Sequence, residues 1–468
     1  MKEIKDYRAI KKFPVLDGYL QHFSQTSMNN EIPGLLSFFF IQGQLLLPYV
    51  RIPTGDNHLD PRVHVFWIQP SRTGKSIAWN FVSDIMDKIG VKWDAFASGT
   101  DAGLIGSNKQ VIDPETHKPT GETEIVPGLL AGQKAINFDE GSILLTPNKH
   151  SQETVLYLQT ACNAVGSKSN ILVKHMKGDK VECESRASLW ITTYPPSGVK
   201  DYVLTKGIFQ RVLLYWKHWD MDMRQEVSNT RLGTFFQRPD ENELSRDDIC
   251  DYFTNTEKRV RDRLYNLADI ERSDWGEMND EEKEEIVQKH MWDMFTPSDD
   301  YQTALYQASD EIYENLGEMS ASMAEIVSSF TPGIENYLGI ISLHMAVLDE
   351  SWEITEEHVD MAFDILNDLF KNLIQWLEDS VEINANKNKE NKIIESLTTA
   401  YNSSADFELE GHGDGWRRKI NVKSMYMEAT GVSKATAERH LKDYAMKVFV
   451  RRKSAQRVHY RLKGLNKR

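Results

Sequence analysis

Residues 63–76 read VHVFWIQPSRTGKS, an apolar run followed by a loop of polar and turn-forming residues. The first six residues favour a buried strand, because branched and aromatic side chains fit a sheet that is covered on both faces. After the loop, apolar residues recur at helical spacing until Gly90, a typical helix end. They are Ile77, Val82, Ile85, Met86 and Ile89. The sequence therefore predicts a strand, a loop and a helix in direct succession.

The loop has the composition of a phosphate-binding loop. Backbone N–H groups at a helix start attract an anion, the Lys75 ammonium reaches terminal phosphates, and the Ser76 hydroxyl ligates Mg²⁺. The residues expected to contact ATP and Mg²⁺ are Gln69, Pro70, Ser71, Arg72, Thr73, Gly74, Lys75 and Ser76. Gln69 stands where the usual motif has its first glycine, so the loop must enter its turn differently. The alternative is a GKS tripeptide that arose by chance.

An acidic pair follows further along the chain. Residues 135–140 read AINFDE, an apolar strand that ends in two adjacent acids. With a phosphate-binding loop before them, Asp139 is expected to act on Mg²⁺ and Glu140 to polarise the attacking water. The alternative is a surface turn, since surface turns also carry such acidic pairs.

Two more apolar runs carry polar residues that suit a triphosphate site. Residues 187–195 read ASLWITTYP, and a hydroxyl at this strand end is suited to lie between the γ-phosphate and the attacking water. A simple strand cap by Thr192 or Thr193 is an equal alternative. Residues 207–215 read GIFQRVLLY, so Arg211 enters an otherwise apolar strand and needs an anionic partner. A γ-phosphate on a neighbouring subunit meets that need, and a structural salt bridge is the alternative.

A lysine-bearing hairpin is predicted between the acidic pair and the threonine strand. Residues 171–183 read ILVKHMKGDKVEC, two apolar-flanked runs with Gly-Asp between them. Lys174, Lys177 and Lys180 suit the phosphates of a nucleic-acid backbone rather than its bases. The alternative is an ordinary solvated hairpin.

Charge divides the chain of 468 residues into an acidic body and a basic end. Residues 415–468 hold 16 lysines and arginines against three acids, a balance of +13, whereas the whole chain carries −15. This asymmetry favours a basic module that contacts nucleic acid, with a solvated basic tail as the alternative.

Cysteine content and hydropathy indicate the cellular compartment in which the protein is expected. The three cysteines (Cys162, Cys183 and Cys250) form no CxxC pair, which argues against a disulfide scaffold and against zinc-site spacing. We expect no secretory signal at the start of the sequence. Residues 35–50 are too short an apolar run to span a membrane, so they predict a buried helix. We therefore expect no membrane partner and a cytoplasmic protein, in the host cytoplasm if the source is viral.

The basic end has the pattern of a winged helix-turn-helix. Residues 421–431 read as one helix, Ser433 as the N-cap of a second, and residues 448–453 and 457–462 as two strands of a hairpin. Contact with DNA is expected from the second helix and the wing. The residues are Lys434, Thr436, Arg439, Lys442, Arg451, Arg452, Lys453 and Arg457. Such domains also serve as protein-interaction modules, which stays as the alternative.

These patterns predict five segments with an α/β fold at their centre. They are an N-terminal helical segment (1–60), an ATPase core (61–220), a helical region with a lid (221–382), a linker (383–392) and a winged-helix domain (393–468). The last helix of the helical region is predicted from apolar residues that recur every three or four positions, namely Val359, Ala362, Leu366, Leu369 and Leu373.

The order of these parts resembles the AAA+ module of minichromosome-maintenance-like helicases. It is closer still to the P-loop helicase domains attached to primases in phages, plasmids and other mobile elements. The resemblance covers about residues 30–380 and implies an AAA+ core with a helical lid. It also implies that Lys75, Asp139 and Glu140 serve catalysis, that Thr193 is sensor 1, that Arg211 is an arginine finger and that Lys174 or Lys177 lies in a central channel.

The resemblance implies an ATP-dependent DNA helicase or translocase that works as a ring of identical subunits, expected to be a hexamer, in replication of a mobile element. Its substrates would be single-stranded and forked DNA, and a separate primase or initiator would be its partner. One alternative is a DNA-packaging or loader ATPase that does not unwind. Another is a winged-helix regulator that only senses nucleotide.

Overall fold

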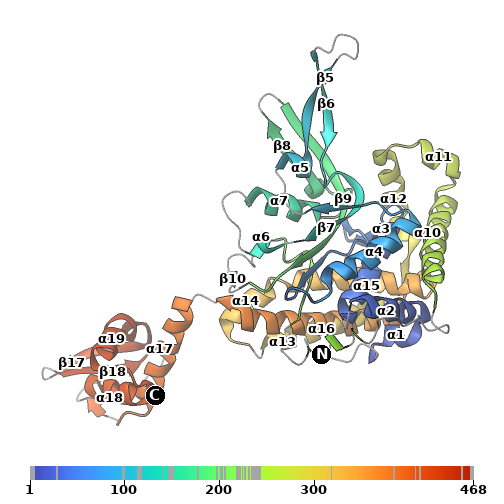
Figure 1. Ribbon diagram of the computed structural model, residues 1–468. Helices are drawn as coiled ribbons and strands as arrows, with labels where there is room; N and C mark the ends of the chain where they lie inside the picture. Colours follow the sequence, from blue (N-terminus) through green and yellow to red (C-terminus); the bar gives the residue numbers. More distant parts are fainter. Residues whose placement is uncertain are drawn as a thin grey trace. The chain divides into compact units, whose positions relative to one another are not determined.

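The computed structural model describes two compact units, Met1–Val381 and Glu382–Arg468 (Figure 1). The described residues are 6–27, 30–96, 101–112, 119–139, 141–145, 152–176, 179–196, 199–200, 204, 207–217, 223, 225, 228–229, 232, 244–317, 319–382, 385–405, 407–409, 413–454 and 457–463. The first unit joins the three segments expected as 1–60, 61–220 and 221–382, because the helices at both ends pack on the sheet in the middle.

A parallel sheet forms the centre of the first unit. Five strands run parallel in the order β11-β3-β9-β7-β4. They are β3 (Val65–Ile68), β4 (Trp93–Phe96), β7 (Gly132–Asp139), β9 (Asp179–Thr193) and β11 (Leu213–Trp216). The fold is therefore mixed α/β with a parallel central sheet, as predicted. The order also places β9 between β3 and β7, so the predicted loop and the predicted acids follow strands on either side of β9.

Helices cover the sheet because its strands are apolar on both faces. On one face, the Trp190 ring of β9 lies 5.6 Å from Phe40 of α3 (Glu31–Leu46) and 6.3 Å from Trp79 of α4 (Lys75–Ile89), between ring centroids. On the other face, Phe66 of β3 packs edge-on against Phe209 at 5.5 Å. All four residues of β3 are fully buried. Such burial explains why this strand reads as a continuous apolar run.

The N-terminal helices belong to this core. They are α1 (Arg8–Lys12), α2 (Pro14–Ser27) and α3. Nearly every residue of α3 is buried, which confirms the prediction of a buried helix in this stretch. None of the helices in the described ranges is both long enough and apolar enough to cross a membrane.

The helices that follow the sheet pack beneath it and beside it. They are α10 (Arg246–Ala268), α11 (Arg272–Glu277), α12 (Asp280–Met294), α13 (Tyr301–Gly317), α14 (Ala321–Ser328), α15 (Thr331–Leu348) and α16 (Glu356–Ser380). The predicted stripe of α16 is buried, with Val359, Ala362, Leu366, Leu369 and Leu373 turned inward. Asn372 of α16 accepts a hydrogen bond from the Trp216 backbone N–H of β11 at 2.9 Å, which fixes this helix to the sheet edge.

Two antiparallel hairpins extend from the sheet on the same side, away from α13 and α16 (Figure 1). The predicted hairpin forms from β8 (Ile171–Met176) and the first residues of β9. The other joins β5 (Gly106–Ile112) to β6 (Pro119–Pro127) and was not predicted. Its polar strands lack a regular apolar alternation, which is why the sequence pattern gave no signal for it.

The second unit contains three helices and a small antiparallel sheet. The helices are α17 (Ala385–Asn402), α18 (Lys419–Thr430) and α19 (Lys434–Val448). The strands β15 (Phe407–Leu409), β16 (Gly413–Arg418), β18 (Arg457–Leu462) and β17 (Phe449–Ser454) lie in that order. Helices α18 and α19 and the β17–β18 hairpin match the two helices and the hairpin predicted from residue 421 onward. Leu397, Tyr401, Tyr426, Leu441 and Phe449 lie in the shared core.

The segment expected as a linker, 383–392, is largely helical and forms the start of α17. The expected linker is thus helical from Ala385 onward. Lysine and glutamate are good helix formers, and α17 gains further stability because its later residues Leu397 and Tyr401 pack in the core of the second unit.

Candidate functional site

The loop between β3 and α4 leaves the start of the helix open to an anion. Gly74 is the N-cap residue of α4 and has a φ of 94°, in the left-handed region that glycine adopts without strain. No side chain caps the first N–H groups of α4, so they are available to a ligand. The Thr73 hydroxyl donates to the Pro70 carbonyl at 2.7 Å and closes the loop on itself.

Gln69 replaces a glycine of the usual motif and bridges the loop with its side chain. Its buried amide accepts from the indole N–H of Trp67 at 2.6 Å and donates to the Thr73 carbonyl at 3.2 Å. Its backbone φ is not positive, so the position does not require glycine in this chain. The loop therefore enters its turn differently, as predicted, and a side-chain amide provides the closure.

Lys75 lies inside this loop and is 8 % exposed. Its ammonium donates to the carbonyls of Gln69 and Pro70, at 2.6 and 2.9 Å. Burial lowers the pKa of Lys75 to about 8, and the Asp139 carboxylate partly opposes that shift. The Lys75 ammonium is thus a buried cation whose hydrogen-bond partners in the described structure are carbonyls, so none of these partners neutralises its charge.

Asp139 lies at the carboxyl end of β7, beside the end of β9. The two strands pair in register with Asp139 opposite Thr192, and the Thr192 hydroxyl donates to the Asp139 carboxylate at 2.7 Å. Asp139 is exposed on its other side, and Ser76 of α4 is also exposed. Glu140, the predicted catalytic base, lies outside the described residues. The structure therefore brings Lys75, Asp139 and a threonine hydroxyl to the same edge of the sheet.

The threonine that contacts Asp139 is Thr192, the neighbour of Thr193, which the resemblance gives as sensor 1. Successive side chains of a strand point to opposite faces, so only one of the pair shares the face of Asp139. The Thr193 hydroxyl donates to the Tyr194 carbonyl at 3.5 Å, while its own carbonyl accepts from the Gln69 N–H at 3.1 Å. From the sequence, either threonine could cap the strand. The register of β7 and β9 places the Thr192 hydroxyl on the face of Asp139.

Arg211 lies at the opposite end of the sheet. It precedes β11, whose first residue, Leu213, is paired with Val65 at the start of β3. The phosphate-binding loop follows the end of β3, so at least the length of that strand, about 10 Å, separates it from Arg211. Arg211 therefore does not reach the loop of its own subunit.

The Arg211 side chain folds back onto neutral groups. It donates to the Asn163 side-chain oxygen at 2.8 Å and to the Gly207 carbonyl at 2.6 Å. A Cβ atom at Gly207 would lie 2.5 Å from the guanidinium, which explains the glycine four residues earlier. Within the described parts of the chain, no carboxylate forms an ion pair with Arg211. The structural salt bridge, which was the alternative interpretation of Arg211, is thus not seen there.

The lysines of the β8–β9 hairpin differ in environment. Lys174 is half-buried, and Lys180 is exposed and forms an ion pair with Glu182 at 2.5 Å. Lys177 lies outside the described residues. The pairing with Glu182 reduces the net positive charge of this hairpin.

The predicted DNA-contact residues of the second unit are mostly exposed. Lys434, Arg439 and Lys442 lie on the surface of α19, while Arg451, Arg452, Lys453 and Arg457 lie on β17 and β18. Thr436 belongs to the helix start, where the Ser433 hydroxyl accepts from its N–H at 3.2 Å, as predicted for an N-cap. Because β17 is an edge strand, its charges also protect that edge from pairing.

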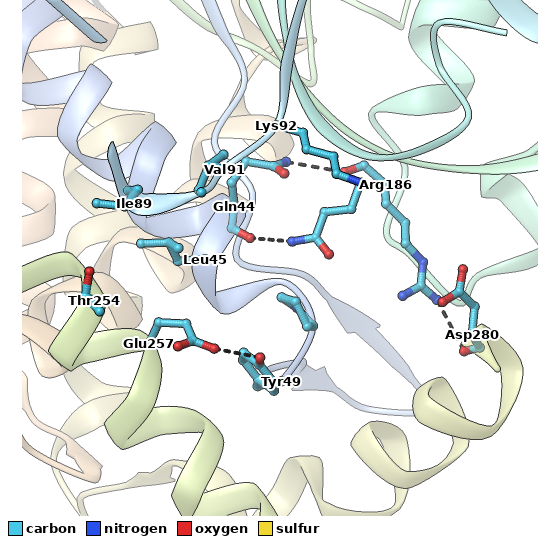
Figure 2. Close-up of a pocket in the computed structure, with 13 residues that line it drawn as sticks. Gln44, Leu45, Tyr49, Ile89, Val91, Lys92, Arg186, Thr254, Glu257 and Asp280 are labelled. Atoms are coloured by element: carbon cyan, nitrogen blue, oxygen red, sulfur yellow. Dashed lines mark hydrogen bonds between the residues drawn. The ribbon is translucent and has the colours of Figure 1, made fainter. Parts of the chain in front are cut away.

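A cavity of about 530 Å³ lies away from this site, at the amino ends of β4 and β7 (Figure 2). Two pairs of polar groups in its wall bond to each other. Tyr49 donates to Glu257 at 2.7 Å, and Gln133 donates to the Gln44 carbonyl at 2.7 Å. Figure 2 shows Arg186 directed toward the Asp280 carbonyl rather than into the cavity. The cavity takes no part in the site at the opposite edge of the sheet.

No protein-family model matches this chain, and no match was found among the curated proteins. Within the described ranges, no three His, Cys, Asp or Glu side chains gather as a ready-made metal site. A single carboxylate with a hydroxyl suits Mg²⁺ that arrives with nucleotide phosphates, since Mg²⁺ keeps several waters and phosphate ligands.

Sequence reasoning missed two residues at these sites. Tyr194 follows the predicted strand end directly, and its ring contacts Lys75. Asn163 holds Arg211 across 48 positions of sequence, and no local pattern marks it.

Proposed function

We propose that the first unit is a P-loop ATPase core of the AAA+ type. The observation that carries the proposal is the position of Lys75 beside the Asp139–Thr192 pair, at the carboxyl ends of three adjacent parallel strands. Open parallel sheets bind ligands outside the carboxyl ends of their strands, where the strand order reverses. Here β3 begins the strand succession yet lies between β9 and β11, so its loop stands at such a point.

In this proposal the loop N–H groups, the start of α4 and Lys75 hold the phosphates of ATP. The Ser76 hydroxyl and Asp139 hold Mg²⁺, which neutralises charge as the γ-phosphate leaves. Thr192 fixes the Asp139 carboxylate, and Glu140 polarises the attacking water.

Arg211 completes the site from a neighbouring subunit. Its distance from its own loop and its neutral partners support a role in trans, as a cation that stabilises the charge of the transition state. A site shared in this way needs a head-to-tail interface between subunits, which forms a ring when its rotation closes, and we propose a hexamer. Helices α13 to α16 would act as the lid of the AAA+ module.

The proposed substrate is single-stranded or forked DNA. The β8–β9 hairpin, with Lys174 and Lys177, would contact the strand in the ring, and the second unit would bind DNA as a winged helix. The exposed cations of α19 and β17 support this role through phosphate contacts, which are salt-sensitive. Together these assignments describe a replicative helicase or translocase of a mobile element.

The test is ATP hydrolysis with and without single-stranded DNA, followed by unwinding of a forked duplex. The wild type should hydrolyse ATP and displace a strand, whereas Glu140→Gln should bind ATP and assemble without unwinding. DNA-stimulated hydrolysis without strand displacement would favour a packaging or loader ATPase. Nucleotide binding without turnover would favour a winged-helix regulator.

A further inference from the structure

In the described structure, the Lys75 ammonium contacts two carbonyl oxygens and an aromatic ring. An ammonium carries three N–H donors. Two reach the carbonyls of Gln69 and Pro70, and the Lys75 nitrogen lies 4.7 Å from the centroid of the Tyr194 ring. This distance is within the range of a cation–π contact, so the ring face takes the third direction.

Tyr194 is placed so that it can leave the lysine without disturbing the core. It follows the last residue of β9, and its side chain is 44 % exposed. The two residues before Tyr194 contact the other parts of the site. The Thr193 carbonyl accepts a hydrogen bond from the Gln69 N–H, and the Thr192 hydroxyl donates one to Asp139. Tyr194 is therefore next in the chain to the residues that contact the loop at Gln69 and the carboxylate of Asp139.

We propose that Tyr194 is a positioning residue whose ring holds Lys75 in the nucleotide-free state and is displaced by the terminal phosphates of a bound nucleotide. The proposal rests on the nucleotide site proposed above and adds a regulatory element to it. A phosphate anion attracts the ammonium more strongly than an uncharged ring face does. The displaced ring then signals occupancy of the loop to the end of β9.

Competition between the ring and phosphate has a direct consequence for affinity. Every contact of the free protein that must break on binding makes the free energy of binding less favourable. Loss of the ring face should therefore tighten binding of ATP and ADP by about two- to fivefold, the range expected for an exposed cation–π contact. Adenosine does not reach the lysine, so its affinity should not change.

The experiment compares full-length wild type, Tyr194→Leu and Tyr194→Phe by calorimetric titration with MgADP, a non-hydrolysed MgATP analogue and adenosine. Phenylalanine keeps the ring face and should bind like the wild type, whereas leucine should bind both phosphorylated ligands more tightly and adenosine equally. Thermal unfolding of each variant checks that the fold is intact.

Two results would count against the proposal in different ways. Equal or weaker binding of ADP by Tyr194→Leu than by Tyr194→Phe would overturn the role of Tyr194 and leave the nucleotide site in place. A wild type that binds neither nucleotide would overturn the proposed function itself.

Discussion

The Thr192 hydroxyl donates a 2.7 Å hydrogen bond to the Asp139 carboxylate across the β7–β9 pair. The bond engages one carboxylate oxygen of Asp139, a residue that is exposed to solvent. It also ties the acid strand to the strand whose other end forms the β8–β9 hairpin. One continuous strand, β9, thus connects the proposed catalytic edge with the proposed DNA-contact element.

Replacement of Thr192 by valine should lower the rate of ATP hydrolysis by about tenfold or more. Valine keeps the shape of threonine and removes a hydrogen bond to a charged group, which contributes roughly 1.5–3 kcal/mol. Steady-state ATPase assays measure the effect. The matched control is Thr193→Val, an equally buried neighbour whose hydroxyl does not contact the acid, and it should retain near wild-type turnover. Equal losses in both variants would contradict the assignment.

Replacement of Asn163 by aspartate should trap Arg211 within its own subunit. A carboxylate at this position would form a charge-assisted pair with the guanidinium, whose hydrogen bonds to described residues go to a neutral amide oxygen and a carbonyl. We expect hydrolysis to fall by about tenfold, since arginine fingers contribute at least that much, while ATP affinity stays unchanged. ATPase assays and nucleotide titration separate the two effects. An unchanged rate would argue against a catalytic role for Arg211.

Mixing of two inactive variants tests whether the site is shared. Arg211→Ala subunits lack the proposed finger, and Lys75→Ala subunits lack the phosphate lysine. A mixed ring contains interfaces at which an intact loop meets an intact arginine, so hydrolysis should partly return on mixing. If the mixture stays as inactive as each variant alone, although both assemble, the shared-site arrangement is wrong.

Nucleotide binding should take up protons above about pH 8. Burial lowers the pKa of Lys75 to about 8 in the free site, and a bound phosphate would raise it again. Below pH 8 the lysine is already charged, so affinity is constant there. Above pH 8 the affinity for ADP should fall, by up to tenfold per pH unit. Calorimetry in buffers of different ionisation enthalpy measures the proton uptake, and adenosine, which does not reach Lys75, is the control.

The Gln69 amide should stabilise the loop. Gln69→Met keeps the length of the side chain but leaves the fully buried Trp67 indole N–H without its acceptor. An unpaired buried donor costs about 1–3 kcal/mol, so the free energy of unfolding should fall by that amount. Urea unfolding measures it. Trp67→Phe removes the indole donor itself, so Gln69→Met should cost less in that background, and an equal loss in both backgrounds would contradict the explanation.

Local patterns in the sequence predicted the elements that carry the candidate site. The apolar run before the loop, the helical spacing after it and the acids at the end of residues 135–140 each depend on neighbours in the chain. The same is true of the buried stripe of α16 and of the N-cap at Ser433. For each of them, short-range geometry and burial were sufficient.

The amino-acid sequence by itself determined that a loop ending in Gly74-Lys75-Ser76 lies between a buried strand and an amphipathic helix, because both are set by residues close in the chain. Only the tertiary structure decided that Thr192 contacts Asp139, that Asn163 holds Arg211 and that the Tyr194 ring faces Lys75. These contacts depend on strand order and register, since a shift of one residue turns a side chain to the other face of the sheet. No local pattern records that choice.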